Sequence, residues 1–201
     1  MINYRNSTAS EAVQIAEIHL NSFKGFFLTT LGFSFLKAYY KTCARSKDAI
    51  SICAIDSDTE QLLGFSVGCY HSKGFNKKLI LSNLRIYSYQ SIILLFTKPL
   101  ALVRLFKNLG KGDDVIKDDG NYAELLSIGV LPDKNGLGIG KKLLVEFEAE
   151  VIKKGVNKIT LTTDADVNEN VLQFYKKSGY KVFYDFVTYP NRKMFKLIKK
   201  I

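Results

Sequence analysis

The chain has 201 residues, of which 47% are hydrophobic and 24% are charged. This balance is typical of a folded globular protein and excludes a disordered chain or a polytopic membrane protein. The formal net charge of +10 favours anionic partners such as nucleic acid, an anionic membrane, a polyphosphate cofactor or an acidic substrate. Because no basic-aromatic recognition motif accompanies the charge, we interpret it as a solvated lysine-rich surface and expect no nucleic-acid partner.

The cysteine pattern indicates a reducing compartment. Cys43, Cys53 and Cys69 are odd in number and lack CxxC or Cys/His spacing, so we expect neither a disulfide framework nor a metal site. The first ten residues lack the apolar core of a signal peptide. We therefore expect a cytoplasmic protein with a single domain over residues 1–201, as a monomer or a homodimer.

The first seventy residues predict a strand, two helices and a hairpin. The expected elements are a strand at residues 2–7, a helix that Thr8 or Ser10 caps and that ends near Leu20, a helix after Gly32, and strands at 49–55 and 62–71. The second helix carries an aromatic stripe, which is typical of a core face. A functional alternative is that residues 23–33 line an acceptor pocket.

Residues 73–120 are too long for a plain connection between two strands. They contain two apolar pieces, 79–96 and 100–106, and we expect two helices hinged at Pro99. Lys98, Pro99 and Arg104 interrupt the apolar run, so no transmembrane span is predicted. The segment has nine Lys or Arg against four Asp. It is either a packed structural insertion, a lid, an acceptor-binding platform or a membrane-surface contact, and its last part, 111–120, is expected to be a loop.

The C-terminal half predicts alternating strands and helices. The expected elements are a strand that ends before Pro132, a helix that Gly155 stops, a strand at 158–163, a helix at 167–178 closed by Gly179, and a hairpin with strands at 180–188 and 194–198. The order of elements is βααββ, a helical insert, then βαβαββ. This order predicts a mixed α/β sheet.

A glycine loop organises this half of the chain. Gly136, Gly138 and Gly140 follow a strand and open a helix, so the backbone can approach an anion closely and the helix adds its free N–H groups and dipole. A Walker A loop is excluded because Lys142 stands where a Ser or Thr is required. A dinucleotide fingerprint requires GxGxxG at the first strand–helix turn, which this GxGxG loop does not match.

Two motifs resemble those of the GNAT acyltransferase superfamily. The frame from Asn135 to Gly140 resembles the acetyl-CoA motif, Arg/Gln-x-x-Gly-x-Gly/Ala, although Asn135 departs from the usual Arg or Gln. The segment from Asn168 to Tyr180 resembles the second motif, N-x-x-A/V-x-x-F-Y-x-x-x-G-F/Y. The resemblance implies an α/β (α+β) GNAT fold with a mixed, mostly antiparallel sheet of about seven strands, a helical insertion between strands 3 and 4, and acetyl-CoA as co-substrate.

The resemblance also implies the donor site. Backbone N–H groups of the loop would hold the pyrophosphate, the exposed backbone of the fourth strand would pair with the pantetheine arm, and Val130 N–H would polarise the thioester carbonyl. For Gly129 the alternative is a β-bulge, which would splay the strands. The expected cofactor-binding residues are Ile128, Gly129, Val130, Asn135, Gly136, Leu137, Gly138, Ile139, Gly140, Lys141, Asn168 and Tyr175.

Two residues are expected to act in catalysis. Glu124, which we place on the same strand face as Ile128 and Val130, matches the general base of some GNAT members. Tyr175 matches a tyrosine that faces the CoA sulfur, and a phenol can protonate a departing thiolate. The structural alternatives are a rim carboxylate paired with a lysine and an aromatic core residue, and we expect Phe174 to pack while Tyr175 points to the cleft.

Three functions are compatible with the sequence. The first is an N-acetyltransferase acting on a primary amine of a small molecule, with a nucleotide-linked amino sugar favoured by the basic insert, or on a protein or peptide amine. The second is a non-catalytic acyl-CoA-binding module. The third is a basic adaptor that uses the 73–120 segment on nucleic acid or as a peripheral membrane contact. His19 and His71 are isolated and are interpreted as structural.

Overall fold

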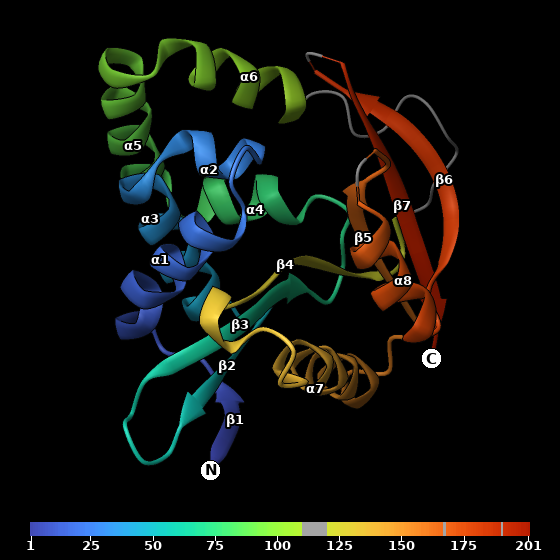
Figure 1. The fold of residues 1–201 in the computed structure, drawn as a ribbon. Coiled ribbons are helices and arrows are strands. Elements are labelled where there is room, and N and C mark those ends of the chain that lie inside the picture. Colours follow the sequence, from blue (N-terminus) through green and yellow to red (C-terminus); the bar gives the residue numbers. More distant parts are fainter. Residues whose placement is uncertain (110–119, 167, 190) are drawn as a thin grey trace.

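Seven strands form one sheet, in the order β1-β2-β3-β4-β5-β7-β6, in a computed structural model that describes residues 1–109, 120–166, 168–189 and 191–201 (Figure 1). The strands are β1 (Ile2–Asn6), β2 (Ala49–Asp56), β3 (Leu62–Cys69), β4 (Ala123–Val130), β5 (Lys158–Asp164), β6 (Lys181–Thr188) and β7 (Arg192–Lys200). Every neighbouring pair is antiparallel except β4 and β5, which are parallel. The expected mixed, mostly antiparallel sheet is confirmed.

One face of the sheet packs against the N-terminal helices. These are η1 (Ala9–Glu11), α1 (Ala12–Ser22), α2 (Phe27–Leu31) and α3 (Phe33–Arg45). The aromatic stripe of α3 is buried in this core, as its spacing predicts, with Tyr40 fully covered and Phe35 5% exposed. The N-terminus of η1 has a capping box between Thr8 and Glu11, so the predicted cap at Thr8 is confirmed.

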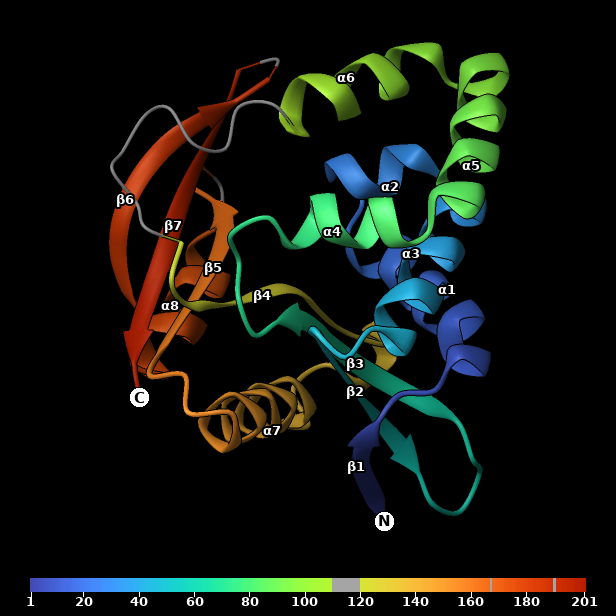
Figure 2. The ribbon, with the colours of Figure 1, turned by 180° about the vertical axis from the view of Figure 1, so that it is seen from behind.

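The other face packs against two later helices, α7 (Ile139–Lys153) and α8 (Glu169–Lys177). Leu143, Leu144, Phe147 and Val151 lie along the buried side of α7 and form a second core with β4 and β5. Gly155 ends α7 with a φ of +73°, a left-handed conformation that favours glycine. The two cores sit on opposite sides of the sheet, as the two views show (Figures 1 and 2).

The insert between β3 and β4 contains three helices, α4 (Phe75–Ser82), α5 (Leu84–Thr97) and α6 (Pro99–Leu109). The expected hinge at Pro99 is confirmed, but the expectation of two helices is wrong because the chain also breaks at Asn83. There the Asn83 side chain donates to the carbonyl of Leu79 at 2.9 Å, and α4 and α5 meet at 96°. The expected 111–120 loop lies outside the described residues except for Gly120.

No single helix among the residues described is long and apolar enough to cross a membrane. The bent pair of α4 and α5 meets the criteria of length and composition only when the two helices are taken together.

Candidate active site

The sheet opens between β4 and β5. The two strands pair only over three residues, Ala123 with Ile159, Glu124 with Thr160 and Leu125 with Leu161. Beyond Leu125, β4 stays paired with β3 while β5 stays paired with β7. The remaining backbone of β4 therefore has no strand neighbour on the β5 side.

A β-bulge in β4 lies at the start of this opening. Ser127 pairs with Val67 and Leu125 with Gly68, so Leu126 is the extra residue. The alternative of a bulge at Gly129 is therefore wrong, because Gly129 pairs with Phe65 in register. Because one extra residue shifts the alternation of side chains, Ile128 lies on the α7 face while Glu124 lies on the opposite face. Our placement of these residues on one strand face is corrected.

The backbone of Ile128 and Val130 faces the opening. Leu131 N–H donates to the carbonyl of Leu63 at 2.8 Å, and bonds to the partner strand alternate along an antiparallel ladder. The N–H groups of Ile128 and Val130 therefore point away from β3, as a thioester-polarising role for Val130 requires. The Val130 carbonyl accepts a hydrogen bond of 3.0 Å from Ser22 Oγ, which ties this strand end to α1.

Gly129 makes room for protein side chains. A Cβ at this position would lie 3.1 Å from the Phe65 ring and 3.2 Å from the Phe23 ring. The missing side chain therefore lets two aromatic rings approach β4 from the α1 side, which is a packing reason for glycine here.

The glycine loop leads into α7 as predicted. Gly136 and Gly138 have φ values of +84° and +77°, and a Cβ on either would meet nothing within 4 Å. These glycines are therefore required for the conformation of the loop, which leaves open space above it. Gly140 is within α7, where its Cβ would be 3.7 Å from Val130 Cγ2, so the helix start lies against the end of β4.

The N-terminus of α7 has free donors. No side chain caps it, and Lys142 N–H makes the first bond back to the Gly138 carbonyl at 3.0 Å. The N–H groups of the three preceding residues thus lack an intrahelical acceptor and point out of the helix end. This donor set fits a pyrophosphate. Around it, Asn135, Leu137 and Lys141 are exposed, whereas the Ile139 side chain is buried in the core and offers only its backbone.

Asn168 stands at the N-cap position of α8, but its side chain does not cap that helix. Its Nδ2 donates to Thr163 Oγ1 at 2.7 Å and to the Asp164 carbonyl at 3.0 Å. Asn168 therefore holds the connection between β5 and α8. A cavity of about 510 Å³ lies beside it and is lined by Ala165, Asn168, Glu169, Asn170 and Val171.

Glu124 is held by two neighbours. Its carboxylate forms an ion pair with Lys196 of β7 and accepts a hydrogen bond from the hydroxyl of Ser72. The Glu124 and Lys196 side chains are 16% and 8% exposed. The structural alternative, a carboxylate paired with a lysine, thus describes its contacts, and Ser72 is a neighbour that the sequence did not indicate.

Tyr175, rather than Phe174, is the buried member of the pair on α8. Tyr175 is 7% exposed and belongs to the α7-side core, while Phe174 packs at the edge of that core. The expected division of roles between the two is therefore wrong, because the helix phase turns Tyr175 inward. Burial raises the pKa of the Tyr175 phenol, so the group keeps its proton at neutral pH.

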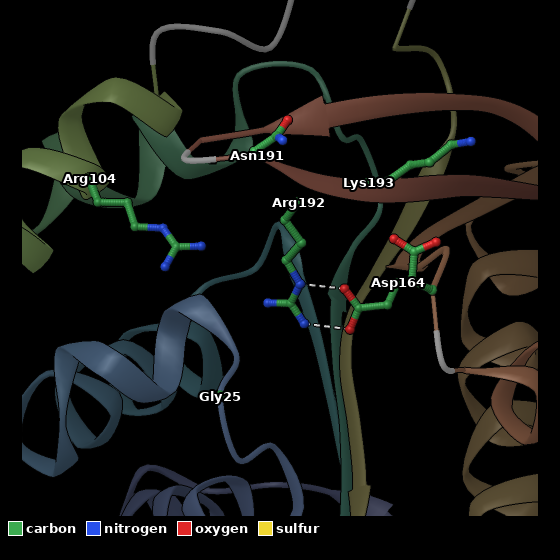
Figure 3. A pocket seen from close by; sticks show the side chains of 7 residues that line it. Gly25, Arg104, Asp164, Asn191, Arg192 and Lys193 are labelled. Carbon is green, nitrogen blue, oxygen red and sulfur yellow. Dashed lines mark hydrogen bonds and ion pairs between the residues drawn. The ribbon is translucent and has the colours of Figure 1, made fainter.

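A second cavity lies on the other side of β5, and apart from Gly25 of the 23–33 segment and Arg104 of the insert the sequence did not indicate its residues. It has a volume of about 530 Å³ and is lined by Gly25, Arg104, Asp164, Asp166, Asn191, Arg192 and Lys193 (Figure 3). Arg192 forms a two-bond ion pair with Asp164 and stacks 4.4 Å from the Phe26 ring. The pairing depends on the register of β5 and β7, for which the local sequence carries no signal.

The lining of this cavity joins distant parts of the chain. Arg104 of the insert donates to the Tyr189 carbonyl at 3.1 Å and lies 5.0 Å from the Phe27 ring. The aromatic segment after α1 thus supports two cations of the cavity. Residues of the 23–33 segment therefore border this cavity.

His19 is buried in the N-terminal core. Its Nδ1 lies 2.6 Å from the Tyr40 hydroxyl, and its Nε2 has no hydrogen-bond partner among the described residues. Burial lowers the pKa of His19 to about 4. The ring is therefore neutral at physiological pH, in agreement with a structural role.

The described part of the chain contains no group of three or more His, Cys, Asp and Glu side chains that could hold a metal ion.

Comparisons with known proteins agree on one superfamily. The profile of the Acetyltransferase (GNAT) family matches residues 89–180, which include the glycine loop and the second motif. No curated protein sequence matches the chain.

Solved structures share the fold. The PaiA N-acetyltransferase of Thermoplasma acidophilum in complex with coenzyme A is 20% identical, with a TM-score of 0.60 and coverage of 100% of this chain and 99% of that one. The ribosomal-protein-S18-alanine N-acetyltransferase of Escherichia coli is 14% identical (TM-score 0.63; coverage 100% and 94%). A spermidine N-acetyltransferase chimera from Vibrio cholerae is 10% identical (TM-score 0.62; coverage 99% and 95%).

The open parallel pair of strands and the glycine loop at the start of α7 belong to a fold that this chain shares with GNAT-type acetyltransferases. The match to the Acetyltransferase (GNAT) profile covers residues 89–180, and the similarity to the solved N-acetyltransferase structures extends over the whole fold.

Proposed function

We propose that this protein transfers the acetyl group of acetyl-CoA directly to the primary amine of a small molecule. The observation that carries the proposal is the pair of cavities on either side of the β5–α8 connection, one bordered by Asn168 and one by Asp164 and Arg192. The first is next to α8, which carries Tyr175, and the second is lined by charged side chains. Donor and acceptor can thus approach the opening from opposite faces of the sheet.

The proposed donor site is made mainly of backbone. The free N–H groups at the start of α7 bind the pyrophosphate, and the N–H groups of Ile128 and Val130 pair with the pantetheine arm. Val130 N–H polarises the thioester carbonyl. Asn168 supports this site by fixing the entry to α8.

The proposed chemistry uses one side chain on each face of the sheet, Glu124 on the α1 side and Tyr175 on the α7 side. The amine nitrogen forms a bond to the acetyl carbon, and the carbon–sulfur bond breaks. Glu124 accepts the proton that the amine loses, directly or through the hydroxyl of Ser72, and Tyr175 donates a proton to the departing thiolate. Lys196 orients the Glu124 carboxylate through their ion pair.

The acceptor cavity favours a small molecule that carries both an amine and an anionic group. Its volume of about 530 Å³ lies within the range of small-molecule sites. Asp166 offers a carboxylate to an ammonium group, while Arg104 and Lys193 offer positive charge to an anion. A nucleotide-linked amino sugar has both features.

A panel of amines tests this proposal. Release of free thiol from acetyl-CoA is measured with a nucleotide-linked amino sugar, the corresponding neutral amino sugar, spermidine and an N-terminal peptide. We expect turnover to be fastest with the nucleotide-linked sugar. Preference for the peptide would assign the protein to the protein acetyltransferases instead, and preference for spermidine would contradict an anionic acceptor.

A further inference from the structure

The helices of the insert expose large apolar side chains to solvent. At the corner where α5 meets α6, Phe96 and Leu100 are 81% and 84% exposed. Six more exposed apolar residues come from the same three-helix segment: Leu81, Leu84, Tyr89, Ile92, Leu95 and Val103. We call these eight side chains the outer apolar face. Apolar surface gathered in this way marks an interaction site.

The outer apolar face is not the packing face of the insert. The buried residues of α5 are Tyr87, Gln90 and Leu94, which point toward the N-terminal core. The hydroxyl of Tyr87 is 2.7 Å from Thr42 Oγ1 of α3, which fixes the helix orientation. The exposed face therefore stays exposed while the inner face remains packed.

The charge of the insert indicates the kind of partner. Residues 61–112 contain no Asp or Glu, and α4, α5 and α6 carry five cations, Lys77, Lys78, Arg85, Arg104 and Lys107, with a sixth, Lys98, between α5 and α6. Apolar side chains flanked by Lys and Arg match the interface of an anionic bilayer. A second copy of the same face would instead bring like charges together, which opposes association.

The position of the insert is compatible with such a contact. In both views α5 and α6 form the edge of the molecule opposite α7 (Figures 1 and 2). A surface bound to α5 and α6 leaves the glycine loop open to solvent. Arg104 of α6 also lines the cavity with Asp164 and Arg192, so the contact would lie beside this cavity.

We propose that the outer apolar face docks on the surface of an anionic lipid bilayer. Phe96 and Leu100 enter the boundary between headgroups and acyl chains, and Lys77 and Arg85 lie toward the anionic headgroups. The inference concerns an interaction surface and is independent of the proposed acceptor and catalytic residues.

Co-sedimentation of the full chain with lipid vesicles tests the proposal. We expect binding to vesicles of phosphatidylglycerol and phosphatidylcholine, binding at least about tenfold weaker to pure phosphatidylcholine, and weaker binding at higher salt. The double variant Phe96→Gln/Leu100→Gln is expected to bind the anionic vesicles at least about tenfold less.

A matched control removes apolar side chains of another exposed site. Val182 and Phe183 of β6 are 48% and 44% exposed, and Val182→Gln/Phe183→Gln should leave vesicle binding unchanged. Absence of binding to anionic vesicles, or equal binding by both double variants, would overturn the proposal. Formation of a dimer that Phe96→Gln/Leu100→Gln abolishes, without vesicle binding, would assign the face to a second copy.

Discussion

The opening between β4 and β5 and the α4–α6 insert differ in what they present to solvent. The opening presents backbone: the free N–H groups at the start of α7, the N–H groups of Ile128 and Val130, and a loop of open glycines. The insert presents side chains, with Phe96 and Leu100 more than four-fifths exposed. The first region is built for a polar ligand of fixed geometry, whereas the second provides apolar area with no fixed partner geometry. Single substitutions in the first region and its supporting core separate these roles.

The largest expected effect is on chemistry at Tyr175. Tyr175→Phe keeps the buried ring but removes the proton for the thiolate, so we expect kcat to fall by about 1,000-fold while acetyl-CoA binding is unchanged. The control is Tyr180→Phe, which alters a buried neighbour whose hydroxyl donates to Glu148 at 3.1 Å. Similar kcat values for both variants would contradict the assignment of Tyr175 as the acid.

A smaller loss is expected at Glu124. Glu124→Gln removes the proton acceptor, and we expect kcat of the folded variant to fall by about 100-fold. Glu148 is a matched control, because it also pairs with a lysine, Lys199 at 2.7 Å, and accepts a tyrosine hydrogen bond. If Glu148→Gln slows turnover as much as Glu124→Gln, the Glu124 carboxylate stabilises the folded structure and does not act as the general base.

Acid should destabilise the core beneath α1. Because the folded state holds His19 neutral with a pKa of about 4, the unfolded state binds more protons between pH 6.5 and 4, and stability falls as pH falls through this window. We expect a loss of about 1.5 kcal/mol from this group between pH 6.5 and 5. Urea unfolding at both pH values measures it. A pH dependence that is the same in His19→Gln would assign the effect to other groups.

The smallest effect is expected at the acceptor cavity. Arg104→Gln removes one positive charge from its lining, so KM for an anionic acceptor should rise by about threefold to tenfold while kcat changes little. Arg45→Gln, at the exposed end of α3, is the control for net charge. An unchanged KM in Arg104→Gln would place the acceptor outside this cavity.

The sequence predicts the backbone part of the site better than the side-chain part. The glycine motif indicates a loop with left-handed conformations, and the structure has positive φ values at Gly136 and Gly138 directly before the start of α7. The same local signal does not locate the bulge at Leu126, because a bulge depends on pairing with β3. Since the bulge reverses side-chain alternation, the sequence places Glu124 on the wrong face relative to Ile128.

Long-range register limits the prediction of the remaining contacts. The ion pairs of Glu124 with Lys196 and of Asp164 with Arg192 join residues 72 and 28 positions apart, and they follow from how β4, β5 and β7 align. In the insert, the proline hinge is predictable because Pro99 cannot continue a helix. The break at Asn83, whose side chain donates to the Leu79 carbonyl, lies inside an apolar run that is equally compatible with one continuous helix.

The central claim is that the N-terminus of α7 binds the acyl-CoA pyrophosphate. The same helix provides a matched pair of glycines, since Gly138 at its start and Gly155 at its end both have positive φ and open space around the Cβ position. A β-branched side chain strains both positions alike.

The most direct measurement is the affinity for acetyl-CoA, by calorimetry, of the unaltered protein, Gly138→Val and Gly155→Val. We predict at least about tenfold weaker binding for Gly138→Val, or 1.4 kcal/mol, and little change for Gly155→Val. Equal affinities for the two variants would contradict a pyrophosphate site at this helix end.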